Sequence, residues 1–353
     1  MRNAQTQPMM KAFLLHGAKD LRAHHLQLPA IPPGHVLVKV KRAGICGSDM
    51  HYYAHGRIGS FIPKRPFVLG HEFAGEVVGA GDATSSSLVG QRVTVDPSIP
   101  CQSCKLCRSG RYNLCRTMRF YGSASCDPHI DGGFAEYALA PEANCFIVPD
   151  SLGWGEAAMI EPLSVVVHAA RRAGNIAGRS VLVTGGGAIG QLMALVARGF
   201  GASQVVMSDI AAYPRDLAMR LGADASLDSR NEDFESEAIA MSQGGFDFVF
   251  EASGNPEALA QAIAVAERGA TIVQVGTLPT PVTAPLNSIM AKELNLMGSF
   301  RFANVFAAAL GLAVSGRINL SALISAVLPL GDMQKAMELA ISKHEVVKIQ
   351  IAP

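Results

Sequence analysis

The sequence predicts an α/β protein with two domains, one β-rich and one built on a doubly wound parallel sheet of six strands. Three observations predict this fold class. The chain has 353 residues, which is enough for two domains. Its first part, up to about residue 150, carries short apolar runs separated by Gly, Pro and Asp clusters. From residue 180 onward, apolar strands alternate with helical stretches.

The composition excludes several classes of protein. Apolar residues make up 49% of the chain and charged residues only 17%, so we expect a globular protein. The net charge of +1 gives no reason to expect nucleic acid or an anionic membrane as a partner. The apolar run at residues 305–314 is too short to span a bilayer, and residues 1–10 carry no apolar signal segment. Seven cysteines, four of them clustered, favour a reducing compartment, so we expect a cytoplasmic location.

The β-rich region is predicted from six short runs of alternating or apolar residues. Turn clusters separate them, which is typical of a compact antiparallel barrel or sandwich-like domain. The predicted strands cover residues 11–15, 35–40, 73–78, 92–95, 134–138 and 145–148.

A helix is predicted at residues 151–172, and the β–α alternation follows it. The expected strands cover residues 180–184, 204–208, 225–227, 246–250, 270–275 and 294–299. The expected helices cover residues 191–200, 232–241 and 256–267. Beyond Arg301, the pattern predicts helices at 302–315 and 332–342 and a last strand at 346–351, which we expect to return to the first domain.

Cys46 opens the first motif that carries chemistry. It follows an apolar strand and begins a turn that also contains Ser48 and His51. His71 and Glu72 come 25 residues later, and Glu161 much later. Cys, His and one or two Glu are the mixed ligands of a catalytic zinc that keeps one position open. An isolated Cys46 would more simply be a buried thiol.

Four further cysteines form a second metal motif. Their spacing is CxxCxxC with a fourth thiol eight residues later, in the set Cys101, Cys104, Cys107 and Cys115. Four thiolates can enclose one tetrahedral Zn²⁺ with no open position, which is a structural site. The alternatives are redox thiols or an iron–sulfur cluster, although Cys115 lacks the proline that follows the last ligand of bacterial cluster motifs. Cys126 and Cys145 are expected to be packing residues.

A glycine-rich turn marks the nucleotide site. Gly185, Gly187 and Gly190 form GxGxxG between a strand and a helix, and Asp209 ends the next strand. This is the full context of a dinucleotide-binding fingerprint. Asp209 would accept hydrogen bonds from the adenosine ribose and repel a 2′-phosphate, which favours NAD and leaves NADP possible. Its alternative role is a helix N-cap. Arg215 on the following helix could weaken the preference for NAD over NADP.

Taken together, these motifs resemble the zinc-dependent medium-chain dehydrogenases over essentially the whole chain. The set comprises Cys46, Gly70-His71-Glu72, the four cysteines, Asp131-Gly132-Gly133-Phe134, Glu161-Pro162 and the fingerprint. Cys46-Gly47-Ser48-Asp49-Met50-His51-Tyr52 and Glu161-Pro162-Leu163-Ser164 look like the polyol branch. Three further segments, at residues 118–124, 128–134 and 298–302, look similar to bacterial L-idonate 5-dehydrogenases.

The resemblance implies a domain division and a chemistry. A GroES-like catalytic domain would cover residues 1–160 and be completed by 301–353, and a Rossmann domain would cover 161–300. Each chain would hold two zinc ions, one catalytic and one structural. Zinc on Cys46 and His71 would bind the substrate hydroxyl, with either Glu72 or Glu161 as third ligand. Ser48 would take the hydroxyl proton and pass it toward His51; alternatively, Ser48 is a turn hydroxyl and His51 a surface residue.

The resemblance also implies contacts for the two small molecules and an assembly. Residues expected at the nucleotide are Gly185, Gly187, Ala188, Ile189, Gly190, Asp209, Ile210, Arg215, Val275, Gly276, Ser299 and Phe300. Residues expected at the substrate are Tyr52, Arg119, Phe120 and Arg301, with Arg57, Lys64 and His129 as weaker candidates. Arg301, then Arg119, would hold a substrate carboxylate. Tyr52, Phe120 and His129 could equally be packing residues, and His168 is expected in the core. Homotetramers or homodimers are usual in the family.

Two readings from other classes compete with the enzyme. The four cysteines alone could belong to a non-catalytic zinc module that binds nucleic acid, but the sequence shows no basic stripe. A scaffold protein could keep the fold without its chemistry. The intact set of Cys46, His71, Glu72 and Glu161 argues against both. Within enzymes, oxidation of sorbitol or xylitol is the alternative to L-idonate.

Overall fold

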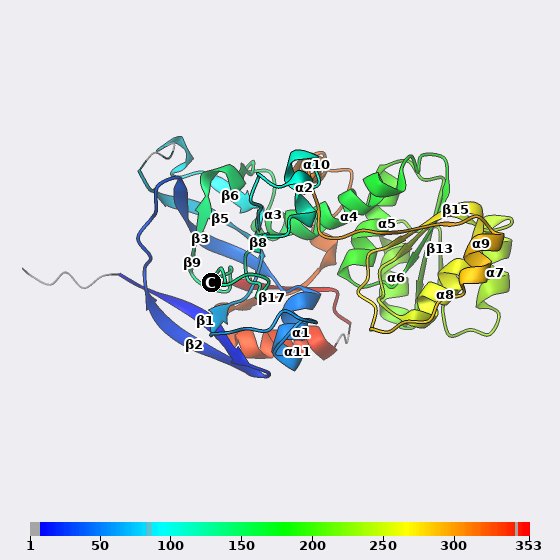
Figure 1. Ribbon diagram of the computed structural model, residues 1–353, viewed down its shortest axis with the longest axis horizontal. Helices are drawn as coiled ribbons and strands as arrows, with labels where there is room; N and C mark the ends of the chain where they lie inside the picture. The colour runs from blue at the N-terminus through cyan, green and yellow to red at the C-terminus, as the bar shows by residue number, and fades with distance from the viewer. Residues whose placement is uncertain (1–7, 83, 85, 343–344) are drawn as a thin grey trace, which may run out of the picture. The chain divides into compact units, whose positions relative to one another are not determined.

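The computed structural model describes residues 8–82, 84, 86–342 and 345–353. The chain forms two compact units. The first comprises Met1–Glu161 and Ile324–Pro353, and the second comprises Pro162–Leu323. Each unit has its own sheets and its own core (Figure 1).

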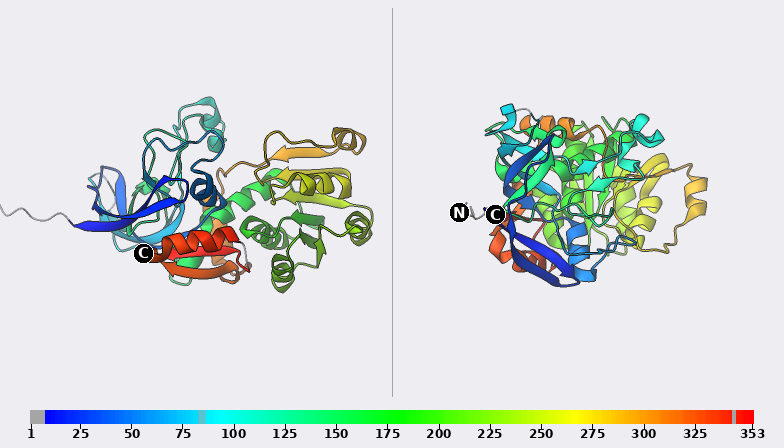
Figure 2. Two further views of the ribbon diagram at one scale, coloured as in Figure 1. Left: turned by 90° about the horizontal axis from the view of Figure 1, so that it is seen from below. Right: turned by 60° about the vertical axis from the view of Figure 1, so that its left-hand side comes forward.

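A mixed sheet of seven strands forms the centre of the first unit. Its order is β10-β6-β5-β3-β18-β17, and β9 also pairs with β3. The strands are β3 (His35–Gly44), β5 (Glu72–Ala80), β6 (Arg92–Val95), β9 (Tyr137–Pro141), β10 (Cys145–Ile147), β17 (Ile324–Pro329) and β18 (Lys348–Ala352). Because β18 pairs with β3, the C-terminal end of the chain completes the N-terminal sheet, as the red and blue ribbons of Figure 2 show.

Smaller elements flank this sheet. A three-stranded sheet has the order β2-β1-β4, and β7 pairs with β8. These strands are β1 (Met9–Gly17), β2 (Asp20–Gln27), β4 (Phe67–Val68), β7 (Ser98–Ile99) and β8 (Arg119–Phe120). The α-helices are α1 (Gly47–His55), α2 (Lys105–Arg108), α3 (Trp154–Ala158) and α11 (Met333–Ser342), and short 3₁₀ turns lie at Ser86–Leu88, Tyr112–Leu114, Glu142–Asn144 and Leu330–Asp332. Aromatic and aliphatic side chains from β1, β3, β5 and α11 share one buried core.

A parallel sheet of six strands forms the second unit, in the order β13-β12-β11-β14-β15-β16. Its strands are β11 (Ser180–Thr184), β12 (Gln204–Asp209), β13 (Ala225–Asp228), β14 (Phe246–Glu251), β15 (Ala266–Gln274) and β16 (Asn295–Gly298). Its helices are α4 (Ile160–Ala173, which begins at the boundary), α5 (Ala188–Gly199), α6 (Ala212–Arg220), α7 (Phe234–Ser242), α8 (Pro256–Val265), α9 (Leu286–Ala291) and α10 (Phe306–Val314), with a 3₁₀ turn at Ser321–Leu323. The strand order reverses beside β11, so a switch point lies between β11 and β14 at the carboxyl edge.

The predicted fold class is confirmed, and three local predictions were wrong. Residues 134–138 were predicted as a strand, but β9 begins at Tyr137. Residues 134–136 pair with β1 only through a single bridge at Ala135, and the Gly133 and Phe134 N–H groups donate to Gly70 O and Leu69 O at 2.7 and 3.0 Å. The single helix expected at 151–172 is two helices, because Pro162 lacks the N–H that would donate to Ala158.

The third difference is the end of α8, which was expected at residue 267. The helix ends at Val265, and β15 begins at once. Lys292 Nζ donates to the carbonyls of Ile263, Ala264 and Ala266, so the last helical carbonyls are satisfied by a side chain. The segment 301–323 groups with the second unit, whereas the sequence analysis placed everything after residue 300 with the first. None of the described helices has the combination of length and apolarity needed to cross a membrane.

Candidate functional site

Cys46 is held at the junction between β3 and α1. Its backbone N–H donates to Asp49 Oδ2 at 2.9 Å, and its carbonyl accepts from the N–H groups of Asp49 and Met50. Asp49 is fully buried, and its other oxygen accepts from Gly70 N at 3.3 Å. One carboxylate therefore fixes the turn of Cys46 and the loop that leads to His71. Asp49 Oδ1 also lies 4.0 Å from His71 Nδ1.

His71 and Glu72 enter the same site from the start of β5. Gly70 has a φ of 92°, and a Cβ there would lie 2.7 Å from the Phe134 ring, so only glycine fits this bend. Glu72 pairs in register with Gly44 on β3, two residues before Cys46. The two ligand-bearing segments therefore grow from neighbouring strands. The ligand atoms of Cys46, His71 and Glu72 all lie within 4.8 Å of one another.

The donor set fits a catalytic zinc. Thiolate, imidazole and carboxylate are the ligand types that zinc takes, and three protein ligands leave one position for a small molecule. His71 and Glu72 are buried, with 6% and 1% of their surfaces exposed. Burial, with a further contribution from Glu72, raises the pKa of the Cys46 thiol to about 11. A divalent cation bound here would lower the pKa of the Cys46 thiol again, because it stabilises the thiolate and the neighbouring carboxylate.

Glu161 is a buried carboxyl group whose interactions reach the same site. Burial raises its pKa to about 8, and the nearby His71 opposes this while Glu72 and Cys46 add to it. Within the described residues, the compact ligand group contains Glu72 and not Glu161. Of the two carboxylates left open by the sequence, Glu72 is therefore the one that the geometry favours as third ligand.

Lys348 on β18 is a site residue that the sequence analysis missed. It is 2% exposed, forms an ion pair with Glu72 Oε2, and donates from Nζ to Ile45 O at 3.0 Å. The lysine therefore holds the Glu72 carboxylate in position within the ligand group. The available signal was a single lysine within the apolar run at residues 346–351. Asp49 was also missed, although it lies inside the quoted Cys46 motif.

Ser48 and His51 lie on α1, three residues apart, on neighbouring positions of one helix face. Ser48 is half-buried, and its hydroxyl hydrogen-bonds the Cys46 thiol. His51 is exposed, with its ring 5.9 Å from that of His55. A path from the metal site to solvent along α1 is therefore chemically reasonable.

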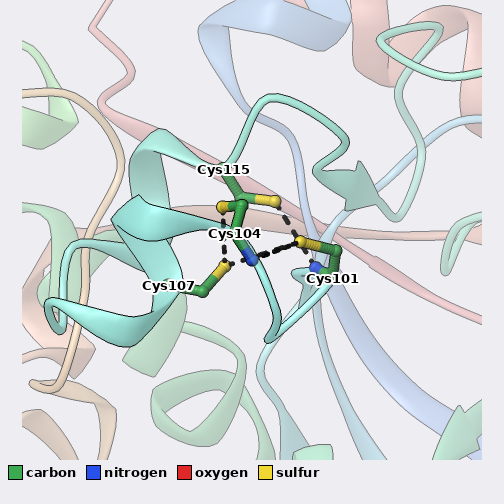
Figure 3. A group of neighbouring side chains, drawn as sticks. All are labelled: Cys101, Cys104, Cys107 and Cys115. Atoms are coloured by element: carbon green, nitrogen blue, oxygen red, sulfur yellow. Dashed lines mark hydrogen bonds between the residues drawn. The ribbon is translucent and has the colours of Figure 1, made fainter.

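The four remaining motif cysteines converge as the sequence predicted (Figure 3). Cys107 Sγ lies 3.9 Å from Cys101 Sγ and 3.5 Å from Cys104 Sγ. Tetrahedral zinc with bonds of about 2.3 Å places its sulfurs about 3.8 Å apart, so the set fits a closed structural site. Backbone N–H groups of Cys101 and Cys104 already point to the sulfurs of Cys115 and Cys101, each at 3.4 Å.

The glycine fingerprint opens α5 at the carboxyl edge of the parallel sheet. A Cβ at Gly190 would lie 1.7 Å from Gly185 O, so this glycine allows the close packing of helix on strand. A Cβ at Gly187, the N-cap of α5, would meet nothing within 4 Å. That open face beside a helix N-terminus fits a pyrophosphate. Ala188 and Ile189 form the first turn of α5.

Other predicted nucleotide residues lie at the same edge. Val275 and Gly276 donate from their N–H groups to Glu251 O, and Ser299 N donates to Gln274 O. Ile210 and Phe300 are exposed by 59% and 53%. Within the described residues, Thr184 Oγ1, Glu251 Oε2 and Ser299 Oγ are buried without a hydrogen-bond partner, as expected near a polar ligand. Glu251, missed by the sequence analysis, binds the turn of Ser253 and Gly254 through Oε1.

The expected substrate residues lie in different surroundings. The Phe120 ring lies 5.5 Å from His71, beside the metal site. Tyr52 is buried, and its hydroxyl accepts from Ala124 N at 2.9 Å. Arg119 is exposed in the first unit, and Arg301 belongs to the second, where its guanidinium lies 5.1 Å from the Phe300 ring. Both ring nitrogens of His129 are engaged by backbone, at Cys126 O and Lys64 N, so His129 is structural.

Comparisons with known proteins show the family to which the chain belongs. The family model for the alcohol dehydrogenase GroES-like domain matches residues 32–150, and the model for zinc-binding dehydrogenase matches residues 188–315. A sorbitol dehydrogenase of Bacillus subtilis is 36% identical over 98% of this chain and 97% of its own length. The chain therefore belongs to the zinc-dependent medium-chain dehydrogenases, within their polyol and sugar-acid branch.

Solved structures agree with this family. The crystal structure of L-idonate 5-dehydrogenase from Escherichia coli has a TM-score of 0.92 and 35% identity, and the match covers 99% of each chain. A zinc-binding dehydrogenase from Sinorhizobium meliloti, bound to NADP, has a TM-score of 0.90 and 37% identity over 98% of this chain and 100% of its own.

Proposed function

We propose that this protein oxidises L-idonate to 5-keto-D-gluconate with NAD as hydride acceptor. The observation that carries the proposal is the buried group of Cys46, His71 and Glu72 with its paired Lys348. Zinc bound there supplies Lewis-acid activation of a substrate hydroxyl. The sugar acid is favoured over a neutral polyol by the three segments similar to L-idonate 5-dehydrogenases and by the relative of that name.

In this proposal the residues of the chain orient the substrate and move one proton. Ser48 would accept the proton of the substrate hydroxyl while its own hydroxyl proton leaves toward His51, and His51 would pass a proton on to solvent. Phe120 packs beside His71 and contributes an apolar wall to the site. Lys348 and Asp49 hold Glu72 and His71 in place. Arg301 holds the substrate carboxylate by a bidentate contact, with Arg119 as second candidate.

The test is a substrate panel with the purified protein. NADH formation is measured with L-idonate, D-gluconate, D-sorbitol and xylitol, and NADH consumption with 5-keto-D-gluconate. A preference for L-idonate and 5-keto-D-gluconate supports the proposal. A preference for sorbitol or xylitol contradicts the acid substrate and supports the second candidate, a polyol 2-dehydrogenase, which the relative from Bacillus subtilis favours.

Two variants identify the carboxylate clamp. Arg301→Gln should raise the KM for L-idonate and leave that for xylitol nearly unchanged, because only the acid carries a carboxylate. Arg119→Gln tests the second candidate in the same way, and Arg116→Gln is the matched control because it removes an exposed arginine three residues before Arg119. Equal effects on both substrates would contradict a clamp at that position.

The assembly and location are also proposals. We propose a homotetramer or homodimer, as is usual among related enzymes, and measurement of the mass in solution tests it. We propose a cytoplasmic location because all seven cysteines are free thiols, and five of them belong to the two candidate metal sites. Neither nucleic acid nor a membrane is proposed as a partner.

A further inference from the structure

Four charged side chains gather at the carboxyl edge of the parallel sheet, where β12 and β13 end. Asp209 and Asp228 are register partners at the ends of these two strands. Arg215 lies on α6, and Arg230 follows Asp228 by two residues. In this fold the adenosine ribose of a dinucleotide lies at the end of the second strand, beside the acid there. We therefore expect the four groups to lie close to the 2′ position of a bound ribose.

Asp209 is already committed to the backbone on both oxygens. Oδ2 accepts from Gly186 N at 2.7 Å, and Oδ1 accepts from Ala211 N at 2.8 Å. Because Gly186 belongs to the glycine turn, Asp209 shapes that turn in addition to its predicted contact with the ribose. Replacing it would change the loop together with the charge.

Asp228 instead holds both arginines. Its Oδ2 lies 3.1 Å from Arg215 Nη1 and 2.8 Å from Arg230 Nη2, and its Oδ1 accepts from Arg230 Nε at 3.1 Å. Arg215 Nη1 also donates to the carbonyl of Asp209 at 2.8 Å, so its guanidinium is fixed beside the end of β12. The hydrogen bond from Arg230 lowers the pKa of Asp228 well below its usual range.

The net charge of these four groups determines whether a ribose with a 2′-hydroxyl or one with a 2′-phosphate binds better. Two carboxylates and two guanidinium groups cancel, so a neutral 2′-hydroxyl is accommodated. A 2′-phosphate carries about two negative charges and is recognised by arginine donors that are free to reach it. We propose that Asp228 is a specificity-determining residue, which engages Arg215 and Arg230 in ion pairs and so disfavours a 2′-phosphate. This inference rests on the proposed nucleotide site and is independent of the substrate.

The test uses two nucleotides that lack nicotinamide, AMP and adenosine 2′,5′-bisphosphate. Their affinity for the full-length protein is measured by calorimetry. Asp228→Asn should bind the bisphosphate about tenfold more tightly than the wild type, because one released charge-assisted hydrogen bond is worth about 1.5 kcal/mol. Affinity for AMP should be unchanged. Asparagine can still accept the Arg230 N–H that Asp228 Oδ1 accepts at 3.0 Å, so the turn is retained.

The matched control is Asp224→Asn. Asp224 precedes the same strand at its other end and also pairs with an arginine, Arg198, at 2.9 Å. The Asp224→Asn variant removes an equal charge from the same unit, but at the end of β13 away from the expected ribose site. It should therefore leave the affinity for the bisphosphate unchanged. An equal gain in both variants overturns the proposal, because general charge would then explain it. No gain in Asp228→Asn overturns it as well.

A double variant tests the role of the arginine. In Asp228→Asn combined with Arg215→Gln, the gain for the bisphosphate should fall by more than half. If the double variant kept the full gain in bisphosphate affinity, the claim that Asp228→Asn acts by releasing Arg215 would be wrong. In turnover, Asp228→Asn should shift the ratio of kcat/KM for NADP to that for NAD upward by about tenfold. Weak turnover of L-idonate with this shift intact would count against the proposed substrate and leave the assignment of Asp228 standing.

Discussion

Lys348 illustrates how much one buried side chain contributes to the site. In the zinc-free protein, Lys348→Met would leave Glu72 buried with an uncompensated charge, which costs about 3–5 kcal/mol in comparable cases. We therefore expect the free energy of unfolding, measured in urea, to fall by that amount. Lys41→Met is the control, since Lys41 pairs with Glu76 at 3.7 Å between the neighbouring strands β3 and β5, with both side chains partly exposed. The control should lose less than about 1 kcal/mol.

Equal losses in the two variants would show that the Lys348 pair is no more than a surface contact. The comparison is informative because both pairs join a lysine to a glutamate of β5. They differ in burial, since the side chains of Lys348 and Glu72 are 2% and 1% exposed while those of Lys41 and Glu76 are 31% and 42% exposed. Burial is therefore the variable that the experiment isolates.

At the residue scale, the sequence predicted ligands better than the residues that orient them. Cys46, His71 and Glu72 were found because metal ligands have recognisable chemistry and spacing. Lys348 was not, because its partner Glu72 lies 276 positions earlier in the chain, and only the pairing of β18 with β3 brings the two together. The prediction that Asp209 faces the ribose stays a prediction, and its bonds to Gly186 and Ala211 show a structural role that spacing could not reveal.

Among the elements, the loop between β7 and β8 depends most on a metal. It contains only α2 and one 3₁₀ turn, and α2 has no buried residue. Such a segment has too little core to fold without a cross-link. We expect Cys107→Ser to lose one zinc per chain and to speed amide hydrogen exchange at residues 101–115, while exchange in β11 and β12 is unchanged.

The control for this loop is Cys126→Ser, which removes a thiol outside the cluster. Its zinc content and exchange pattern should match those of the wild type. If Cys107→Ser kept its full zinc content, the four thiols would not form the closed site. Faster exchange throughout both units would show that the effect is not local.

The connection from β6 to β7 makes stability depend on pH. Burial raises the pKa of Asp96 in this connection to about 6, from an ordinary 3.8. The folded state therefore binds the proton more tightly than the unfolded state. This stabilisation is complete below about pH 4 and is lost as the pH rises through about 6, and a shift of about two pKa units corresponds to at most about 3 kcal/mol.

Asp96→Asn should therefore remove that part of the decline between about pH 4 and pH 7. Asparagine keeps an oxygen for Ser98 N, which Asp96 Oδ1 accepts at 2.9 Å. Unfolding in urea across this pH range gives the measurement, with Asp150→Asn as the control because that side chain is 96% exposed. If Asp96→Asn and the wild type had parallel pH profiles, Asp96 would not be the group that titrates.

Element boundaries were predicted where local patterns decide them and missed where tertiary contacts do. The strand–turn–helix at β11 and α5 follows its glycine spacing closely. The end of α8 depends on Lys292, which follows it by about 27 residues, and the start of β9 depends on the loop at Gly70. The sequence analysis missed β17 because the residues of this strand carry no local pattern that indicates pairing with another strand.

For the whole molecule, the sequence predicted the number and kind of units, since each has its own periodicity. The return of β18 to the first sheet was expected only in outline, and β17 was not predicted at all, because pairing between distant strands leaves no local signal. The segment 301–323 was assigned to the first domain and groups with the second, where α10 packs its buried face.

The central claim is that zinc at Cys46, His71 and Glu72 carries the reaction in this protein. The direct measurement compares wild type with Cys46→Ala for zinc content, NADH binding and NADH formation from L-idonate or xylitol. We predict loss of one zinc per chain and loss of turnover, with NADH binding retained, because the fingerprint belongs to the second unit. Turnover that survives in Cys46→Ala would contradict the account, whatever the substrate.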